Sequence, residues 1–281
     1  MGTLYLVATP IGNLEDITAR ALRILAQVAL IAAEDTRHTG KLLEHFQIRT
    51  SLTSYHEHNK LVKLDKILSV LAAGDVALVS DAGTPGLNDP GLELIQAVLA
   101  AGHVVSPIPG PSAPVAALVS SGLPTDAFLY LGYLPRKQSQ RRRLLAEIAG
   151  LAYTLIFLEA PHRLLETLTD LEAVLGDRPM CAARELTKLH EEIYRSSVSQ
   201  ARAHYLDQSP RGEFTLIVAG RQKNAAEWSE EQVLQAVSQA QACGESTAQT
   251  AASVAELSGW PRRKVYRLVL ATAERTGHEP G

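Results

Sequence analysis

The sequence has only two cysteines in 281 residues, Cys181 and Cys243. They lie far apart, so their spacing matches neither a redox motif nor a metal-binding motif and excludes a disulfide framework. A chain of this kind suits a reducing compartment, and we expect a cytoplasmic protein.

Long apolar runs are also missing. No apolar run reaches the roughly 20 residues that a membrane-spanning helix needs. The first 20 residues have no basic stretch before their short apolar run, unlike a secretory signal. We therefore expect no partnership with a membrane.

Neither sign of charge is in strong excess. The formal net charge is -3, with 20% charged and 46% hydrophobic residues. This balance is ordinary for a globular chain and excludes disorder over most of its length. Any affinity for nucleic acid must therefore come from local basic clusters.

The first part of the chain alternates short apolar runs with amphipathic stretches. This alternation predicts βαβ units and a mostly parallel sheet covered on both faces. We assign it to a first α/β domain, residues 1–124. The predicted strands are residues 3–9, 28–34, 76–80 and 103–108, and the predicted helices are residues 14–27, 39–46, 63–73 and 91–102.

A second α/β domain is predicted at residues 125–222. Three of its strands lie close together in sequence, which favours a mixed sheet. The remainder, residues 223–281, follows a polar linker and reads as short helices resembling a helix-turn-helix. The predicted strands of this domain are residues 128–134, 154–160, 180–186, 191–198 and 213–220, with helices at 136–148 and 162–176.

Loops rich in Gly, Pro and small polar residues follow four strands of the first domain, at residues 9–13, 34–38, 80–86 and 109–113. In open α/β sheets, ligands bind beside the carboxyl ends of the strands. A single loop of this kind is most often a plain turn, but four at one edge favour a binding cleft.

The loop after the third predicted strand belongs to the segment ALVSDAGTPGLNDPG, residues 77–91. It has neither the Lys-Ser/Thr ending of a P-loop nor the spacing of a dinucleotide turn. Asp81 stands at the strand's end, where it would repel a phosphate. The predicted ligand is therefore neutral or cationic at that point.

Other motifs allow two interpretations. EDTRH at 34–38 is either a helix cap or a site, and the pair Arg184 and Glu185 in ARELTK is either a surface ion pair or part of a site. His56 and His58 have no third ligand nearby in sequence, so no metal site is predicted.

Two basic clusters, PRKQSQRRR at 135–143 and PRRKVYR at 261–267, could bind RNA phosphates. The alternatives are a solvated helix face for the first cluster and a helical hairpin packed on the body for the second.

Six motifs follow one another in the chain order TPIGNLEDIT, AEDTRHTGKLL, SDAGTPGLNDPG, PGPSA, FLEAPHR and ARELTK. Together they resemble the ribosomal RNA ribose methyltransferases of the tetrapyrrole-methylase superfamily. The resemblance covers roughly the whole chain. It implies two α/β domains, S-adenosylmethionine in the cleft between them, a homodimer, and methylation of a cytidine 2′-hydroxyl in the decoding region of the small subunit. By the same resemblance, the expected cofactor-binding residues are Pro10, Asp81, Gly83, Thr84, Gly86, Ser112, Ala113 and Leu158.

A ribose hydroxyl gains from a nearby base and from cations that stabilise a developing alkoxide. The candidate catalytic residues are Glu159, Asp35, Arg184, Glu185 and Lys188. The candidate RNA-binding residues are Arg37, Arg136, Lys137, Arg141, Arg142, Arg143, Arg163, Arg262, Arg263, Lys264 and Arg267.

Two other functions remain open at this point. One is methylation of a tetrapyrrole or a protein side chain within the same superfamily, which the basic clusters disfavour because a small substrate needs neither of them. The other is a non-catalytic nucleic-acid-binding protein, which the four polar loops disfavour.

Overall fold

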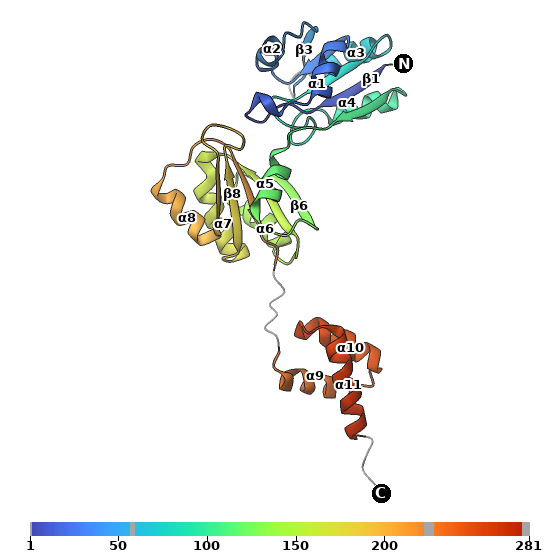
Figure 1. Cartoon of the computed structure of the whole chain (residues 1–281), viewed down its shortest axis with the longest axis vertical. Coiled ribbons are helices and arrows are strands. Elements are labelled where there is room, and N and C mark those ends of the chain that lie inside the picture. Colours follow the sequence, from blue (N-terminus) through green and yellow to red (C-terminus); the bar gives the residue numbers. More distant parts are fainter. Residues whose placement is uncertain (1, 57–59, 222–227, 277–281) are drawn as a thin grey trace. The chain divides into compact units, whose positions relative to one another are not determined.

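The computed structural model describes residues 2–56, 60–221 and 228–276. The chain forms two compact units, Met1–Gly220 and Arg221–Gly281. The first unit contains two five-stranded sheets and the second contains three helices (Figure 1). Within the described residues no helix is long and apolar enough to cross a membrane.

The first sheet is entirely parallel, with the strand order β3-β2-β4-β1-β5. Apolar residues of α1 and α2 pack on one face, and those of α3 and α4 pack on the other. This arrangement confirms the doubly covered parallel sheet predicted from the alternating pattern. The elements are β1 (Thr3–Val7), α1 (Ala19–Gln27), β2 (Leu30–Ala33), α2 (Thr36–His45), β3 (Leu52–Ser54), α3 (Lys60–Leu71), β4 (Val76–Val79), α4 (Leu92–Ala100) and β5 (Val104–Ile108), with a 3₁₀ turn at Leu14–Asp16.

The second sheet is mixed, as predicted, with the order β6-β7-β10-β8-β9. Only β6 and β7 pair in parallel, and the remaining pairs are antiparallel. Its elements are β6 (Phe128–Tyr133), α6 (Gln138–Ile148), β7 (Thr154–Glu159), a 3₁₀ turn (Pro161–Arg163), α7 (Leu164–Leu175), β8 (Pro179–Arg184), β9 (Glu192–Ser197), α8 (Val198–Asp207) and β10 (Phe214–Val218).

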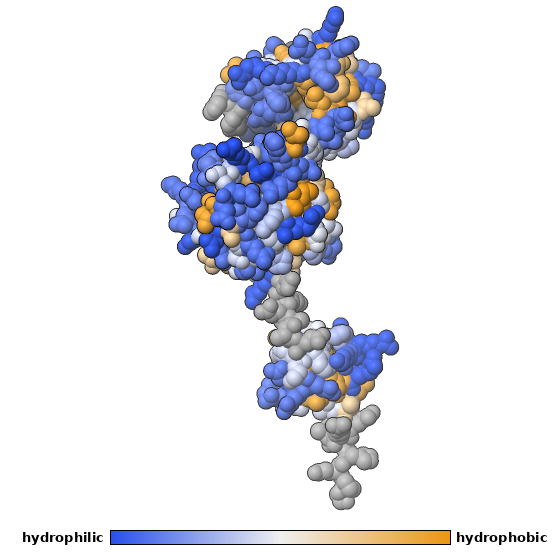
Figure 2. Space-filling view, turned by 60° about the vertical axis from the view of Figure 1, so that its left-hand side comes forward, coloured by the Kyte–Doolittle hydropathy of each residue, from blue (hydrophilic) through white to orange (hydrophobic). Residues whose placement is uncertain are grey.

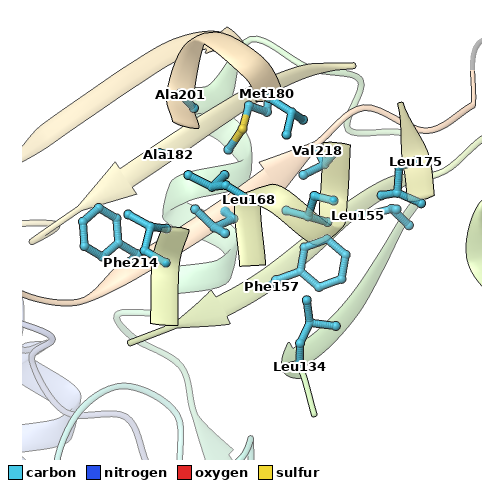
Figure 3. Close-up of a cluster of buried hydrophobic side chains, with 14 of the residues drawn as sticks. Leu134, Leu155, Phe157, Leu168, Leu175, Met180, Ala182, Ala201, Phe214 and Val218 are labelled. Carbon is cyan, nitrogen blue, oxygen red and sulfur yellow. The ribbon is translucent and has the colours of Figure 1, made fainter. Parts of the chain in front are cut away.

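The largest core lies between this second sheet and the helices α6, α7 and α8 (Figure 3). Phe157 of β7, Leu168 of α7 and Leu216 of β10 are completely buried there. Every residue of β10 is buried, so this central strand lacks the alternation of a half-exposed strand.

Helix α5 (Ala113–Ser121) covers the opposite face of the second sheet. Its residues Ala117 and Leu118 pack with Ile156, Cys181 and Ile217. The domain boundary predicted at residue 124 does not account for this packing, because it places α5 with the first sheet.

The sequence did not predict helix α8 or strand β3. Helix α8 begins with a capping box, in which the side chains of Ser197 and Gln200 bond to each other's backbone N–H groups. Strand β3 has only three residues, too few for a periodic signal.

The second unit folds around its own apolar core. Its helices are α9 (Glu230–Ala242), α10 (Thr247–Ser258) and α11 (Arg262–Thr276). Gly259, at φ 72°, ends α10 in the left-handed conformation that favours glycine. The core residues are Val233, Val237, Ala251, Val254, Trp260, Val265 and Val269.

Two arginines predicted to bind RNA form contacts within the protein. Arg141 is 1% exposed, and its Nε donates to Asp170 Oδ2 at 2.6 Å. The Arg163 Nη2 donates to the carbonyl oxygens of Leu134 and Pro135, and its Nε lies 3.3 Å from Glu159 Oε1. These contacts hold the Arg141 guanidinium inside the protein and leave that of Arg163 partly exposed.

Asp170 holds the α6–α7 junction through this buried ion pair. Desolvation raises its pKa, but hydrogen bonds from Arg142 and Arg141 outweigh it and lower the pKa overall. We expect Asp170→Ala to lower the free energy of unfolding by about 3–5 kcal/mol, because it removes the buried partner of Arg141. The exposed Glu166, whose Oε2 lies 3.6 Å from Arg141 Nη2, would then be the remaining carboxylate near this buried charge.

Urea denaturation checks this expectation. Glu147→Ala is the control, because it removes the partner of the exposed Arg143 in an i,i+4 pair and should cost less than about 0.5 kcal/mol. Equal losses in the two variants would contradict the structural role of Asp170.

Candidate functional site

The predicted loops meet at the carboxyl edge of the first sheet. Thr9 and Gly83 exchange two backbone hydrogen bonds of 2.9 and 3.0 Å, which join the loops after β1 and β4. The N–H of Asp35 donates to Asp81 Oδ1 at 3.0 Å and so adds the loop after β2. These bonds hold the loops that form the floor of the site.

A cavity of about 270 Å³ opens above this floor, and residues of both sheets line it. Among the residues predicted for the site, the lining includes Asp81, Gly83, Thr84, Ser112, Ala113, Leu158 and Lys188. The structure therefore brings together residues that are more than 100 positions apart in sequence.

Four carboxylates line this first cavity: Glu34, Asp81 and Asp89 from the first sheet region and Glu213 from the second. The N–H of Asp81 donates to Glu34 Oε2 at 3.3 Å. Burial raises the pKa of Glu34, with further contributions from Asp81 and Asp35. Burial and the nearby Glu34 raise the pKa of Asp89 to about 6. A cavity that concentrates acidic groups favours a cationic ligand and repels an anion.

A second cavity, of about 440 Å³, adjoins the first. The two cavities share a wall formed by Ile11, Asp81, Ala82, Lys188 and Glu213. Pro10, predicted as a cofactor-binding residue, lines only this second cavity.

Lys188 lies on that shared wall and is held by two carboxylates. Its Nζ donates to Glu185 Oε1 at 2.9 Å and to Glu213 Oε2 at 3.0 Å. Desolvation lowers the pKa of Lys188, but the two carboxylates outweigh this effect and raise it. Lys188 is therefore a fixed cation at the boundary between the cavities.

Close backbone packing also fixes Lys188. A Cβ atom added to Gly12 would lie 2.4 Å from Lys188 Cγ, so only glycine lets the loop after β1 approach this side chain. The lysine itself belongs to a tight turn in which Glu185 and Thr187 both have positive φ angles, 49° and 67°.

Comparisons with known proteins show which family the chain belongs to. A model described as "Tetrapyrrole (Corrin/Porphyrin) Methylases" matches residues 3–202. The chain belongs to the tetrapyrrole methylase family. The resemblance seen in the sequence motifs is thereby confirmed.

Relatives of this methylase are similar along most of its length. A protein of Synechocystis sp. named "Ribosomal RNA small subunit methyltransferase I" is 50% identical over 273 residues, 96% of this chain and 98% of the relative. A protein of the same name from Thermotoga maritima is 45% identical over 223 residues, 79% of this chain and 100% of the relative.

Solved structures of lower identity share the fold. The uroporphyrin-III-C-methyltransferase of Thermus thermophilus is 22% identical with a TM-score of 0.54, and covers 78% of this chain and 94% of its own. A cobalt precorrin-4 methyltransferase is 16% identical with a TM-score of 0.58, over the same shares of the two chains.

Some residues predicted for the methylase site lie outside both cavities. Glu159 is 2% exposed, and its carboxylate accepts hydrogen bonds from Thr167 Oγ1 and from the N–H of Ala160. Arg163 also approaches Glu159, which is absent from both cavity linings.

Two further residues predicted for the site, Asp35 and Arg184, lie in local ion pairs. Asp35 caps α2 and accepts from Arg37 at 2.7 Å, and these hydrogen bonds hold its pKa below the ordinary value. The Arg184 Nε lies 3.4 Å from Glu192 Oε2. Both cavity linings lack five of the residues predicted for the site: Asp35, Arg37, Arg184, Glu185 and Gly86.

Four of the five basic residues in the cluster at 135–143 are exposed: Arg136, Lys137, Arg142 and Arg143. Arg142 also pairs with Asp170, and Arg143 also pairs with Glu147. In the second unit, the four basic residues of α11 are exposed: Arg262, Arg263, Lys264 and Arg267.

Sequence reasoning missed several residues of the cavity linings. Glu34 lies in the motif AEDTRHTGKLL, and Asn88 and Asp89 lie in SDAGTPGLNDPG. Nothing in these motifs shows which of their side chains line the cavity. Tyr130, Tyr133 and Glu213 come from the second sheet, and no sequence signal linked them to the loops of the first. No group of three His, Cys, Asp or Glu side chains suited to a metal was found among residues 2–56, 60–221 and 228–276, and His58 lies outside those ranges.

Asp89 provides a test of the acidic cavity. Burial raises the pKa of Asp89 in the folded state, so the folded protein binds more protons than the unfolded chain between about pH 4 and pH 6. The stability that protonated Asp89 contributes is therefore lost as the pH rises through that window. We expect Asp89→Asn to raise the midpoint of urea unfolding at pH 7.5, and to raise it less at pH 5. The exposed Glu15→Gln should leave both midpoints unchanged, and an unchanged Asp89→Asn profile would contradict the raised pKa.

Proposed function

We propose that this methylase transfers a methyl group from S-adenosylmethionine to the 2′-hydroxyl of a cytidine in the decoding region of small-subunit ribosomal RNA. The observation that carries the proposal is the match of 44–51% identity to proteins named "Ribosomal RNA small subunit methyltransferase I". The tetrapyrrole alternative has weaker support, because similarity to porphyrin and corrin enzymes is limited to the fold at 16–22% identity.

The side chains that line the first cavity suit the chemical groups of the proposed cofactor. S-adenosylmethionine carries a sulfonium and an ammonium group, and the carboxylates Glu34, Asp81 and Asp89 offer complementary charge and hydrogen-bond acceptors. Its adenosine needs hydrogen bonds and an apolar surface, which Thr84, Ser112 and Leu158 supply. When bound, the cofactor supplies an electrophilic methyl group.

Lys188 and Glu213 are the proposed catalytic pair. Both lie on the wall shared by the cavities, where a hydroxyl from one side meets the cofactor from the other. Glu213 accepts the proton of the ribose hydroxyl, and the Lys188 cation stabilises the developing alkoxide. Most of the remaining rate enhancement comes from holding the two substrates in line.

The substrate partner is the ribosomal RNA, either free or in the assembled small subunit, and the proposed place of action is therefore the cytoplasm. Arg136 and Lys137 of the first unit and the basic residues of α11 are the proposed phosphate contacts, because exposed cations on a chain of low net charge attract a polyanion locally.

A homodimer is also proposed, on the basis of exposed apolar residues. Leu92, Leu99 and Val104 of the first sheet region are 60%, 56% and 58% exposed. Figure 2 shows orange side chains gathered on one face of this region. A monomer seldom leaves large contiguous apolar patches in water, so a second copy is the proposed cover.

The decisive experiment is methylation of small subunits. Particles from a strain lacking this protein are incubated with tritiated S-adenosylmethionine, and the label is mapped by nuclease digestion and chromatography of nucleosides. The proposal expects 2′-O-methylcytidine at a single position. Label on a base, on protein or nowhere in the particle would refute it.

Asp81→Ala tests the cofactor site. We expect it to weaken S-adenosylmethionine binding by about 1.5–3 kcal/mol, because a charged hydrogen-bond acceptor is lost. Asp81→Asn removes the charge but keeps an oxygen that can accept from the Asp35 N–H. Comparing the two variants therefore separates the effect of the charge on cofactor affinity from that of the hydrogen bond. Calorimetry on the folded variants measures both effects, and unchanged affinity in both would exclude Asp81 from the site.

Lys188→Met tests the catalytic pair, since methionine keeps much of the packing against Gly12 but removes the charge. We expect kcat to fall by about 10²–10³-fold, as for the loss of one oxyanion donor. The affinity for S-adenosylmethionine should change by less than twofold. A wild-type kcat at saturating RNA would remove Lys188 from the mechanism.

A further inference from the structure

The second cavity differs in character from the first, although the two share a wall. Away from that wall its lining is Thr9, Pro10, Gly12, Asn13, Leu14, His38, Lys41 and Leu42. None of these side chains is acidic, so the carboxylates at this site are confined to the first cavity and the shared wall.

The far rim of the second cavity is basic. His38 and Lys41 lie one turn apart on α2, and both are exposed. In the described part of the chain, Lys41 forms no ion pair, whereas the neighbouring Arg37 is bound to Asp35. Lys41 is thus a free cation at the mouth of a cavity, which is the arrangement that attracts a phosphate.

Another part of the same cavity is apolar. Pro10, Ile11 and Leu14 come from the loop after β1, and Leu42 comes from α2. Leu14 is 40% exposed, which is high for a large apolar side chain beside a cavity. Flat apolar surfaces of this kind pack against the face of a nucleobase.

The cavity also has the size of a small-molecule site. Its volume of about 440 Å³ falls within the roughly 300–1,000 Å³ typical of ligand pockets. An apolar surface, a basic rim and a polar wall toward the methyl donor together match the three parts of a nucleotide: base, phosphate and ribose.

We infer that the second cavity holds the nucleotide that is methylated, extruded from the RNA strand. The base packs on Pro10, Ile11 and Leu14, and the adjoining phosphate lies at His38 and Lys41. The ribose faces the wall that carries Lys188 and Glu213. This inference rests on the proposed function and adds to it the place and contacts of the target nucleotide.

The main alternative is that the second cavity belongs to the cofactor site. That alternative predicts that its residues affect S-adenosylmethionine and RNA together. The nucleotide assignment predicts that they affect RNA alone, so binding measurements with each ligand separate the two.

The test uses the full-length protein with the paired substitution His38→Gln and Lys41→Gln. We expect KM for small subunits to rise by about 10-fold, and the slope of log affinity for RNA against log salt to become shallower by about 1. The calorimetric Kd for S-adenosylmethionine should stay within twofold of the wild type. Lys66→Gln, which removes an exposed cation from α3 on the other face of the sheet, should change none of these values.

A second variant, Leu14→Trp, fills the cavity without changing charge. We expect it to abolish methylation while S-adenosylmethionine binding and the circular dichroism spectrum are retained. The inference is overturned if either variant loses cofactor affinity in step with RNA affinity, or if both keep wild-type KM and turnover. If the wild-type protein does not methylate the small subunit, the proposed function fails, and the nucleotide assignment fails with it.

Discussion

The parallel pairing of β1 with β4 and β5 is the constraint on which the site depends. Parallel strands place all their carboxyl ends at one edge, and the polar loops that follow them meet there. The hydrogen bonds between Thr9 and Gly83, and from Asp35 to Asp81, then fix these loops against one another. Without the parallel register, Glu34, Asp81 and Asp89 would not form one acidic cavity.

Away from their shared wall, the two cavities differ in the charge of their lining residues. The proposed methyl donor has a cationic sulfur and the proposed RNA substrate is anionic, so the two ligands need surroundings of opposite sign. The structure has acidic side chains in the first cavity and His38 and Lys41 at the rim of the second, with the Lys188–Glu213 pair between them.

The sequence predicted both sheets because their strands are continuous apolar runs between turn residues. It could not distinguish a charged residue in a site from one in a buried ion pair. Arg141 and Glu159 lie in motifs as polar as those of Lys188 and Asp81, but Arg141 bonds to Asp170 and Glu159 to Thr167 in buried contacts that the motifs do not reveal. Asp89 and Glu213 were missed for a similar reason, because their place in the cavity lining depends on contacts between segments remote in sequence.

The two units of the chain differ in what they contribute to the candidate site. Both cavities are lined only by residues of the first unit, and the family model ends at residue 202. The entire Thermotoga relative matches 223 residues of this chain, close to the length of Met1–Gly220. A methylase of that length has room for both sheets but not for a further 61-residue unit such as Arg221–Gly281. The second unit has its own core and an exposed basic helix, and we propose that it contributes contacts to the RNA and no reacting group.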